Sequence, residues 1–202
     1  MKKRITALAL SLVMALALTA PALAARINTS NMPGHEVLSE LPDAPRRPAR
    51  PATLEQAGFS DSHEAWTFAQ SREEVFQEIV ELTDSLTAGK STDTQKIKAI
   101  YDWVSQNVMY DDRGKGGGSL FAYAGRRAVC EGYADLCRLM GTIAGIPVAD
   151  FGGMSNSDVQ KSGPHGWNAA FADGKWIFFD ATWKMWDMAP DYHDETGDFY
   201  CY

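Results

Sequence analysis

The sequence has few cysteines and no membrane-length hydrophobic run beyond its first residues. Three cysteines in 202 residues, at positions 130, 137 and 201, cannot form the dense disulfide framework of many small secreted domains. No apolar run after residue 18 approaches the roughly 20 residues that a transmembrane helix needs. Basic residues are also scarce, with 19 Lys and Arg against 26 Asp and Glu. This acidic balance argues against a surface for nucleic acid or anionic membranes.

The first 24 residues have the pattern of a secretory signal peptide. A basic start at residues 2–4 precedes an apolar run over residues 5–18, and Ala22-Leu23-Ala24 matches the small-residue cleavage pattern. We therefore expect a secreted, extracellular protein, and the sequence leaves the cell envelope open as a second location. Removing the three basic residues of the leader leaves 16 basic residues against 26 acidic ones.

A proline-rich segment follows the leader over residues 25–58. It holds five of the nine prolines, with arginines at positions 46, 47 and 50 and few large apolar side chains. Proline removes backbone hydrogen-bond donors and keeps the chain extended, so such a segment does not build a helix or sheet of its own. We interpret it as a disordered tether, and a cleavable pro-segment or a wall-associating arm is the less favoured alternative.

Residues 59–202 are expected to form a single globular domain. Ser71 with Glu74 and Thr92 with Gln95 make capping boxes, and apolar residues recur at helical spacing after each pair. These patterns predict two helices, one ending near position 89 and the other near position 108. Four glycines between positions 111 and 119 predict a mobile loop, which lacks the Gly-Lys-Ser/Thr ending of a nucleotide-binding loop.

A third helix, predicted over residues 130–144, is apolar on most of its circumference and should be buried. Gly145 and Pro147 supply its stop signals. Cys130 stands at its start, where unpaired amide groups and the positive end of the helix dipole favour a thiolate. Cys137 lies roughly 10 Å further along the helix, too far for a disulfide with Cys130, and is interpreted as a core residue.

Two β-prone segments flank Asp173-Gly174 and predict a hairpin with a two-residue turn. In that register, the alternation of side chains puts His165 and Asp180 on one face as diagonal neighbours. Asn168 falls on the opposite face, where we expect a structural hydrogen-bonding role. A shift of one residue in the turn would separate His165 from Asp180.

Three motifs follow one another along the chain: Val-Cys-Glu-Gly-Tyr-Ala at residues 129–134, His-Gly-Trp-Asn at residues 165–168 and Asp-Ala-Thr-Trp at residues 180–183. In this order they resemble the motifs of the transglutaminase-like superfamily. The resemblance covers about residues 97–183. It implies an α+β, papain-like core, in which a buried helix bearing the cysteine packs on an antiparallel sheet bearing the histidine and the aspartate. Lys184 departs from the family, which often has an acidic residue there.

The resemblance also implies a catalytic triad. Cys130 would be the nucleophile, His165 the general base and acid, and Asp180 the residue that orients the imidazole. A metal site from the same three side chains is disfavoured because structural zinc needs four ligands, and no cofactor is expected. Trp183, at the strand end, is the aromatic residue best suited to line a cleft, and Cys201 has no assigned role.

These parts predict thiol-dependent acyl transfer or hydrolysis at amide bonds of protein or peptide substrates. The triad does not encode whether water or an amine accepts the acyl group. A cysteine peptidase, a deamidase and a cross-linking transglutaminase therefore all stay open. The alternative from another functional class is a catalytically inactive transglutaminase-like module that binds peptide or cell-wall ligands.

Overall fold

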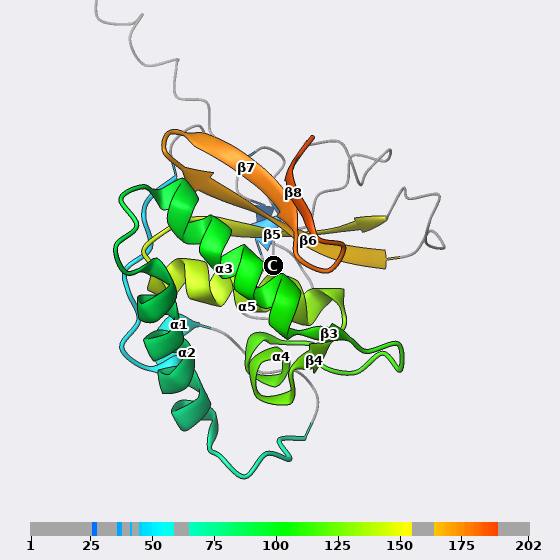
Figure 1. Cartoon of the computed structure of the whole chain (residues 1–202). Helices are drawn as coiled ribbons and strands as arrows, with labels where there is room; N and C mark the ends of the chain where they lie inside the picture. The colour runs from blue at the N-terminus through cyan, green and yellow to red at the C-terminus, as the bar shows by residue number, and fades with distance from the viewer. Residues whose placement is uncertain are drawn as a thin grey trace, which may run out of the picture.

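The computed structural model describes residues 26–27, 36–37, 41, 45–58, 65–154 and 164–189. The predicted signal peptide and Cys201 lie outside these residues. Within them, no helix is long and apolar enough to cross a membrane. Mixed helices and strands make an α+β fold, in which helices cover one face of an antiparallel sheet (Figure 1).

Three long helices and two short ones form the helical layer. They are α1 (Leu54–Ala57), α2 (Arg72–Thr87), α3 (Asp93–Asn107), α4 (Ser119–Gly125) and α5 (Cys130–Ile143). Both predicted capping boxes are present. The side chains of Ser71 and Thr92 accept hydrogen bonds from the backbone amides of Glu74 and Gln95, and the side chains of Glu74 and Gln95 accept from the backbone amides of Ser71 and Thr92. The predicted third helix is α5, which begins at Cys130 as expected and ends one residue early.

The main sheet has four antiparallel strands in sequence order. They are β5 (Val148–Met154), β6 (Pro164–Ala172), β7 (Lys175–Asp180) and β8 (Met185–Met188). Two short pairs lie apart from it: antiparallel β1 (Arg26–Ile27) with β2 (Glu36–Val37), and parallel β3 (Met109–Tyr110) with β4 (Arg127–Ala128). In Figure 1, α3 and α5 run across the face of the main sheet, and their contacts with β6 place the helical layer there.

The β6–β7 hairpin has the predicted turn and register. Asp173 and Gly174 both have positive φ, 50° and 86°, as a tight two-residue turn requires. Ala172 pairs with Lys175, and the ladder runs to Asn168 opposite Phe179. Because the register fixes which side chains share a face, this turn decides how the candidate site is assembled.

The two faces of the sheet belong to different apolar clusters. One face contributes Ala170, Ala172, Ile177 and Phe179 to the large core that it shares with α2, α3, α4 and α5. The opposite face contributes Trp167, Ala169 and Phe178 to a smaller cluster with Ala149 and Phe151. The buried helix α5 therefore packs on a sheet that is apolar on both faces.

The described part of the predicted tether does not behave as a free spacer. Arg50 makes a two-bond ion pair with Asp84 of α2, at 2.7 and 2.8 Å, and Arg47 pairs with Asp93 of α3. Leu54 and other residues of the short helix α1 pack against the core. The arginines and apolar groups of residues 45–57 thus have partners on the helices, which the proline content of the segment does not reveal.

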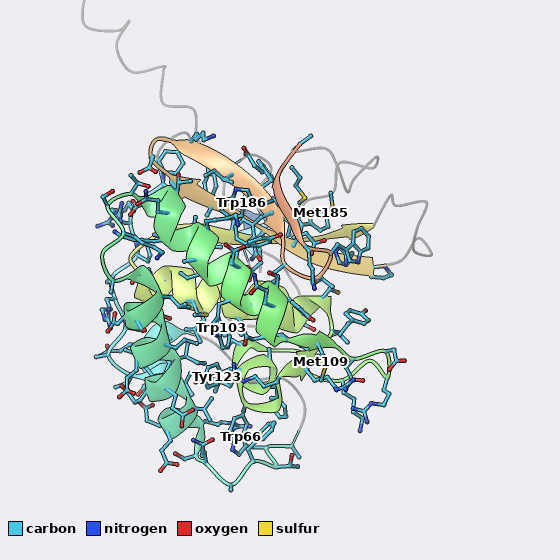
Figure 2. The ribbon with its side chains drawn as sticks, in the orientation of Figure 1. Trp66, Trp103, Met109, Tyr123, Met185 and Trp186 are labelled. Atoms are coloured by element: carbon cyan, nitrogen blue, oxygen red, sulfur yellow. The ribbon has the colours of Figure 1, made fainter. Side chains whose placement is uncertain are left out.

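Helix α4 and strand β8 lie where no element was predicted. The glycine-rich stretch remains a loop over residues 111–118, and α4 follows it directly. Tyr123 of α4 stacks on Trp103 of α3 with ring centroids 5.9 Å apart, and Figure 2 shows the two labelled residues close together. Packing against α5 and α2 explains how a seven-residue helix forms without a side-chain cap at its N-terminus.

Candidate active site

Cys130 is the first residue of α5, at a helix start that no neighbouring side chain caps. The preceding residue, Val129, has no side-chain oxygen to accept hydrogen bonds from the first amides. Cys130 is partly exposed, whereas Cys137 is fully buried, and neither of the two forms a disulfide. Burial raises the pKa of the Cys137 thiol well above its ordinary value, which suits a core residue.

Glycines let the start of α5 approach its neighbours closely. A Cβ atom at Gly132 would lie 2.3 Å from the carbonyl oxygen of Gly116 in the glycine-rich loop. On the other side, a Cβ at Gly166 of β6 would lie 3.7 Å from the Cα and amide nitrogen of Glu131. The first turn of α5 is therefore held between the loop and the strand that carries His165.

His165 projects from β6 and contacts both of its predicted partners. Its Nε2 atom lies 2.6 Å from Oδ2 of Asp180. The imidazole also hydrogen-bonds to the Cys130 side chain. The predicted diagonal contact across the hairpin is present, and the structure brings all three predicted residues together.

Asp180 is completely buried at the end of β7. Its second carboxylate oxygen, Oδ1, accepts hydrogen bonds from the backbone amides of Thr182, at 2.8 Å, and Trp183, at 3.1 Å. The turn after β7 thus fixes one oxygen and leaves the other for His165. A carboxylate held by backbone amides cannot rotate away from the imidazole, so it is suited to orient the ring.

The electrostatics of the site favour a protonated His165. Burial opposes the charged imidazolium, but hydrogen bonds and charge from Asp180 and Cys130 outweigh it and raise the pKa of His165 from 6.5 to about 9. Only 6% of the His165 side chain is exposed, so water screens these interactions weakly. A charged imidazolium beside a thiol is the arrangement that activates cysteine as a nucleophile.

Two tryptophans flank the imidazole. Trp183 stacks on His165 with ring centroids 4.2 Å apart and an angle of 15° between the planes. Trp167, on the same strand as His165, lies at 6.1 Å and 19°. The sequence predicted that Trp183 would line a cleft. That role stays a prediction, and the structure places the Trp183 ring over one face of the imidazole.

A family model for the transglutaminase-like superfamily matches residues 80–181, half of the chain. The chain belongs to the transglutaminase-like superfamily. The matched residues include Cys130, His165 and Asp180, together with α5 and the β6–β7 hairpin. The predicted α+β architecture, with helices packed on an antiparallel sheet, is that of the superfamily.

Two curated relatives with sequence similarity to the chain are named as peptidases. Human kyphoscoliosis peptidase is 27% identical over 116 residues, which are 51% of this chain and 18% of that protein. The mouse protein of the same name is 26% identical over the same shares. The chain thus spans under a fifth of these curated relatives.

Two solved structures resemble the chain at low identity. A candidate cysteine protease from Cytophaga hutchinsonii is 24% identical with a TM-score of 0.49, covering 55% of this chain and 38% of that one. The structure of a TGase is 17% identical with a TM-score of 0.46, covering 62% of this chain and 34% of that one.

Tyr110 lies near Cys130, and the sequence did not predict it as a neighbour of the candidate site. It pairs with Ala128, two residues before Cys130, and 50% of it is exposed. Burial raises the pKa of its hydroxyl, and so does the charge of Cys130, so the two groups are near each other. Figure 2 shows the adjacent exposed residue, Met109, on β3. No motif marked Tyr110, because its proximity to Cys130 arises from the β3–β4 pairing.

Within the described ranges, no group of three or more His, Cys, Asp and Glu side chains has an arrangement that could hold a metal ion. A thiol, an imidazole and a carboxylate in contact can carry out nucleophilic and general acid–base steps.

Proposed function

We propose that this protein catalyses thiol-dependent hydrolysis or acyl transfer at amide bonds of proteins or peptides. The observation that carries the proposal is the double contact of His165, with Asp180 at 2.6 Å and with the side chain of Cys130. The three residues come from α5, β6 and β7, so their meeting is a property of the fold and not of local sequence. Membership of the transglutaminase-like superfamily supports the same chemistry.

In the proposed mechanism, the Cys130 thiolate attacks the carbonyl carbon of an amide bond. The His165 imidazolium then gives its proton to the departing amine or ammonia, leaving a thioester on Cys130. Neutral His165 next removes a proton from the acceptor, which attacks the thioester and releases the acyl group. Asp180 keeps the ring oriented throughout and balances its positive charge whenever the ring is protonated.

The start of α5 supplies one group for the negative oxygen that forms during attack. The backbone N–H of Cys130 belongs to the first helical residue, so it has no partner within the helix. A fixed N–H in that position is suited to stabilise an oxyanion next to the nucleophile.

Water is the acceptor we favour. The curated relatives are named peptidases, which supports hydrolysis over cross-linking for this chain. Deamidation of glutamine and cross-linking to lysine use the same thioester and are distinguished by their products. Secretion through residues 1–24 is a further part of the proposal, whereas association with a cell wall has no support from the superfamily assignment and is not included.

The direct test exposes a mixture of glutamine- and lysine-containing peptides to the wild-type protein and to Cys130→Ala. Mass spectrometry then separates the reactions, since new termini mark proteolysis, a gain of about 1 Da marks deamidation, and a loss of about 17 Da marks cross-linking. Cys137→Ala is the matched control, because it removes the buried thiol and leaves the site intact.

We expect new peptide termini with wild-type protein and with Cys137→Ala, and none with Cys130→Ala. Cross-linked products that depend on Cys130 would keep the triad and make an amine the acceptor. Deamidated products that depend on Cys130 would keep both the triad and water as the acceptor, and would change only the amide that is attacked. If folded wild-type protein produces no Cys130-dependent change in any peptide, the enzyme proposal fails and a binding module becomes the better interpretation.

A further inference from the structure

We propose that Asn168, held by Asp150 and Arg138, is a positioning residue that fixes Cys130 relative to His165. This inference rests on the proposed function, because it concerns the alignment of the same nucleophile and base. It assigns a role to a buried polar cluster that the mechanism above does not use. The cluster lies on the α5 side of the sheet, the face opposite to His165.

The hydrogen bonds of Asn168 join two strands and a helix. Its Nδ2 atom donates to Oδ1 of Asp150 at 2.6 Å and to the carbonyl oxygen of Ala134 at 3.2 Å. Asp150 is the register partner of Asn168 across β5 and β6. A single amide group thus links both strands to the second turn of α5.

Arg138 of α5 also binds Asp150, so it connects this cluster to the same helix. Its Nε atom pairs with Oδ2 of Asp150, and its Nη2 atom lies 3.5 Å from Oδ1 of Asp135. Arg138 follows Ala134 by four residues, so both lie on one face of α5. The helix is therefore attached to the sheet at two successive turns, once through Ala134 and once through Arg138.

The orientation of the Asn168 amide is determined by its surroundings. If the amide were flipped, its oxygen would face the carbonyl of Ala134, which cannot donate a hydrogen bond, and the carboxyl group of Asp150, which pairs with Arg138. In the orientation observed, Oδ1 has no hydrogen-bond partner within the described part of the chain. A buried polar atom without a partner destabilises a fold, so its presence calls for a compensating role.

The position of the cluster relates it to the reacting groups. Cys130 precedes Ala134 by one helical turn, and Gly166, between His165 and Asn168, lies against Glu131 at the start of α5. Strand β6 therefore runs along the first two turns of the helix, with the contact at Gly166 made without a side chain. Asn168 supplies the directional bond that prevents α5 from sliding along the strand. A displacement of about 1 Å between reacting groups is enough to lower an enzymatic rate about 100-fold.

The test measures how fast iodoacetamide alkylates Cys130 at pH values from 5 to 9, resolved by peptide mass spectrometry. Alkylation at low pH reports the thiolate that is paired with the His165 imidazolium, and it requires no knowledge of the substrate. We expect Asn168→Ala to lower the rate at pH 6 by about tenfold or more and to move the profile to higher pH.

The matched control is Val75→Ala, in a fully buried position on α2. It lowers the melting temperature through a cavity while leaving the α5–β6 contact unchanged, so its alkylation profile should equal that of the wild type. If Asn168→Ala does not fold, Arg138→Gln replaces it, since 23% of the Arg138 side chain is exposed and the substitution is milder. It should lower the same rate severalfold.

The outcomes separate this inference from the proposed function. Suppose that wild-type Cys130 is alkylated rapidly and that folded Asn168→Ala or Arg138→Gln has the same profile of alkylation rate against pH. This result would overturn the positioning role and leave the enzyme proposal standing. Alkylation of wild-type Cys130 at pH 6 that is no faster than that of a simple thiol would instead count against the activated nucleophile itself.

Discussion

His165 retains its proton over an extended pH range because two partners favour the charged ring. Burial alone would lower its pKa, but Asp180 and Cys130 raise it to about 9. The charged form is needed to protonate the leaving amine, so kcat/KM should fall as pH rises through about 9. A profile of kcat/KM between pH 6 and 10.5 measures this limb.

Replacing Asp180 with asparagine should move the alkaline decrease in kcat/KM to lower pH. Asp180→Asn removes the charge and the carboxylate acceptor that raise the His165 pKa, so the alkaline loss of activity should occur at lower pH, with a lower maximum. An unchanged alkaline limb in Asp180→Asn would mean that the carboxylate does not control the proton on His165.

Trp183 provides a second prediction at this scale. Its ring covers the imidazole at 4.2 Å, and its backbone amide holds Asp180. Trp183→Ala keeps the backbone bond and removes only the ring, so kcat should fall about tenfold with little change in KM. Trp183→Phe keeps a flat ring and should recover most of the rate. Equal kcat values for the two variants would contradict a stacking role.

The sequence predicted those site residues that a local turn or motif marks. It did not predict the residues that reach the site only through packing between distant segments. The hairpin turn alone predicted the contact between His165 and Asp180, whereas the role of Cys130 beside them was implied by the resemblance of the three motifs to the superfamily. Tyr110 and the Asp150–Arg138 pair could not be predicted, because pairing between β3 and β4 and between α5 and β5 joins segments with no shared pattern.

Among the elements, α5 depends on glycines at its first turn. A Cβ at Gly132 would lie 2.3 Å from a backbone oxygen, whereas one at Gly166 would meet its nearest atoms at 3.6 to 3.7 Å, an ordinary contact. Gly132→Ala should therefore destabilise the protein by about 1–3 kcal/mol and impair the site, while Gly166→Ala should cost under about 1 kcal/mol.

Urea unfolding of both variants measures the difference. Gly166→Ala serves as the control, since it adds the same methyl group on the other side of the same helix start. Equal stability of the two variants would show that the glycine-rich loop does not pack tightly on α5.

Local signals explain which elements could be predicted. Capping boxes determine where α2 and α3 begin, and two residues of positive φ determine the β6–β7 turn. Strand β8 has no such signal, because its pairing with β7 includes a register shift at Phe178 and Phe179. Helix α4 begins after a glycine without a side-chain cap and owes its formation to tertiary contacts.

At the scale of the whole molecule, residues 45–57 act as part of the domain. Their ion pairs join positions 34 and 46 residues apart, and composition alone does not predict such pairings. Deleting residues 1–58 should lower the free energy of unfolding by about 2 kcal/mol or more, mainly through lost packing of Leu54 and its neighbours.

Two comparisons check the origin of that effect. Deleting residues 1–40 alone should retain most of the stability, since Arg47, Arg50 and α1 remain. The double variant Arg47→Ala/Arg50→Ala should cost under about 1 kcal/mol, because these arginines are exposed. If the protein that lacks residues 1–58 has the same free energy of unfolding as the wild type, the segment acts as a spacer and does not stabilise the domain.

Capture of the acyl-enzyme tests the central proposal most directly. Wild-type protein treated briefly with an activated acetyl ester at pH 7 and quenched in acid should carry one acetyl group, mapped by mass spectrometry to Cys130. The group should be absent from Cys130→Ala and strongly reduced in His165→Ala, with no acetyl on Cys137. Acetylation of Cys130 at the same slow rate in the wild type and in folded His165→Ala would contradict an activated Cys130–His165–Asp180 site.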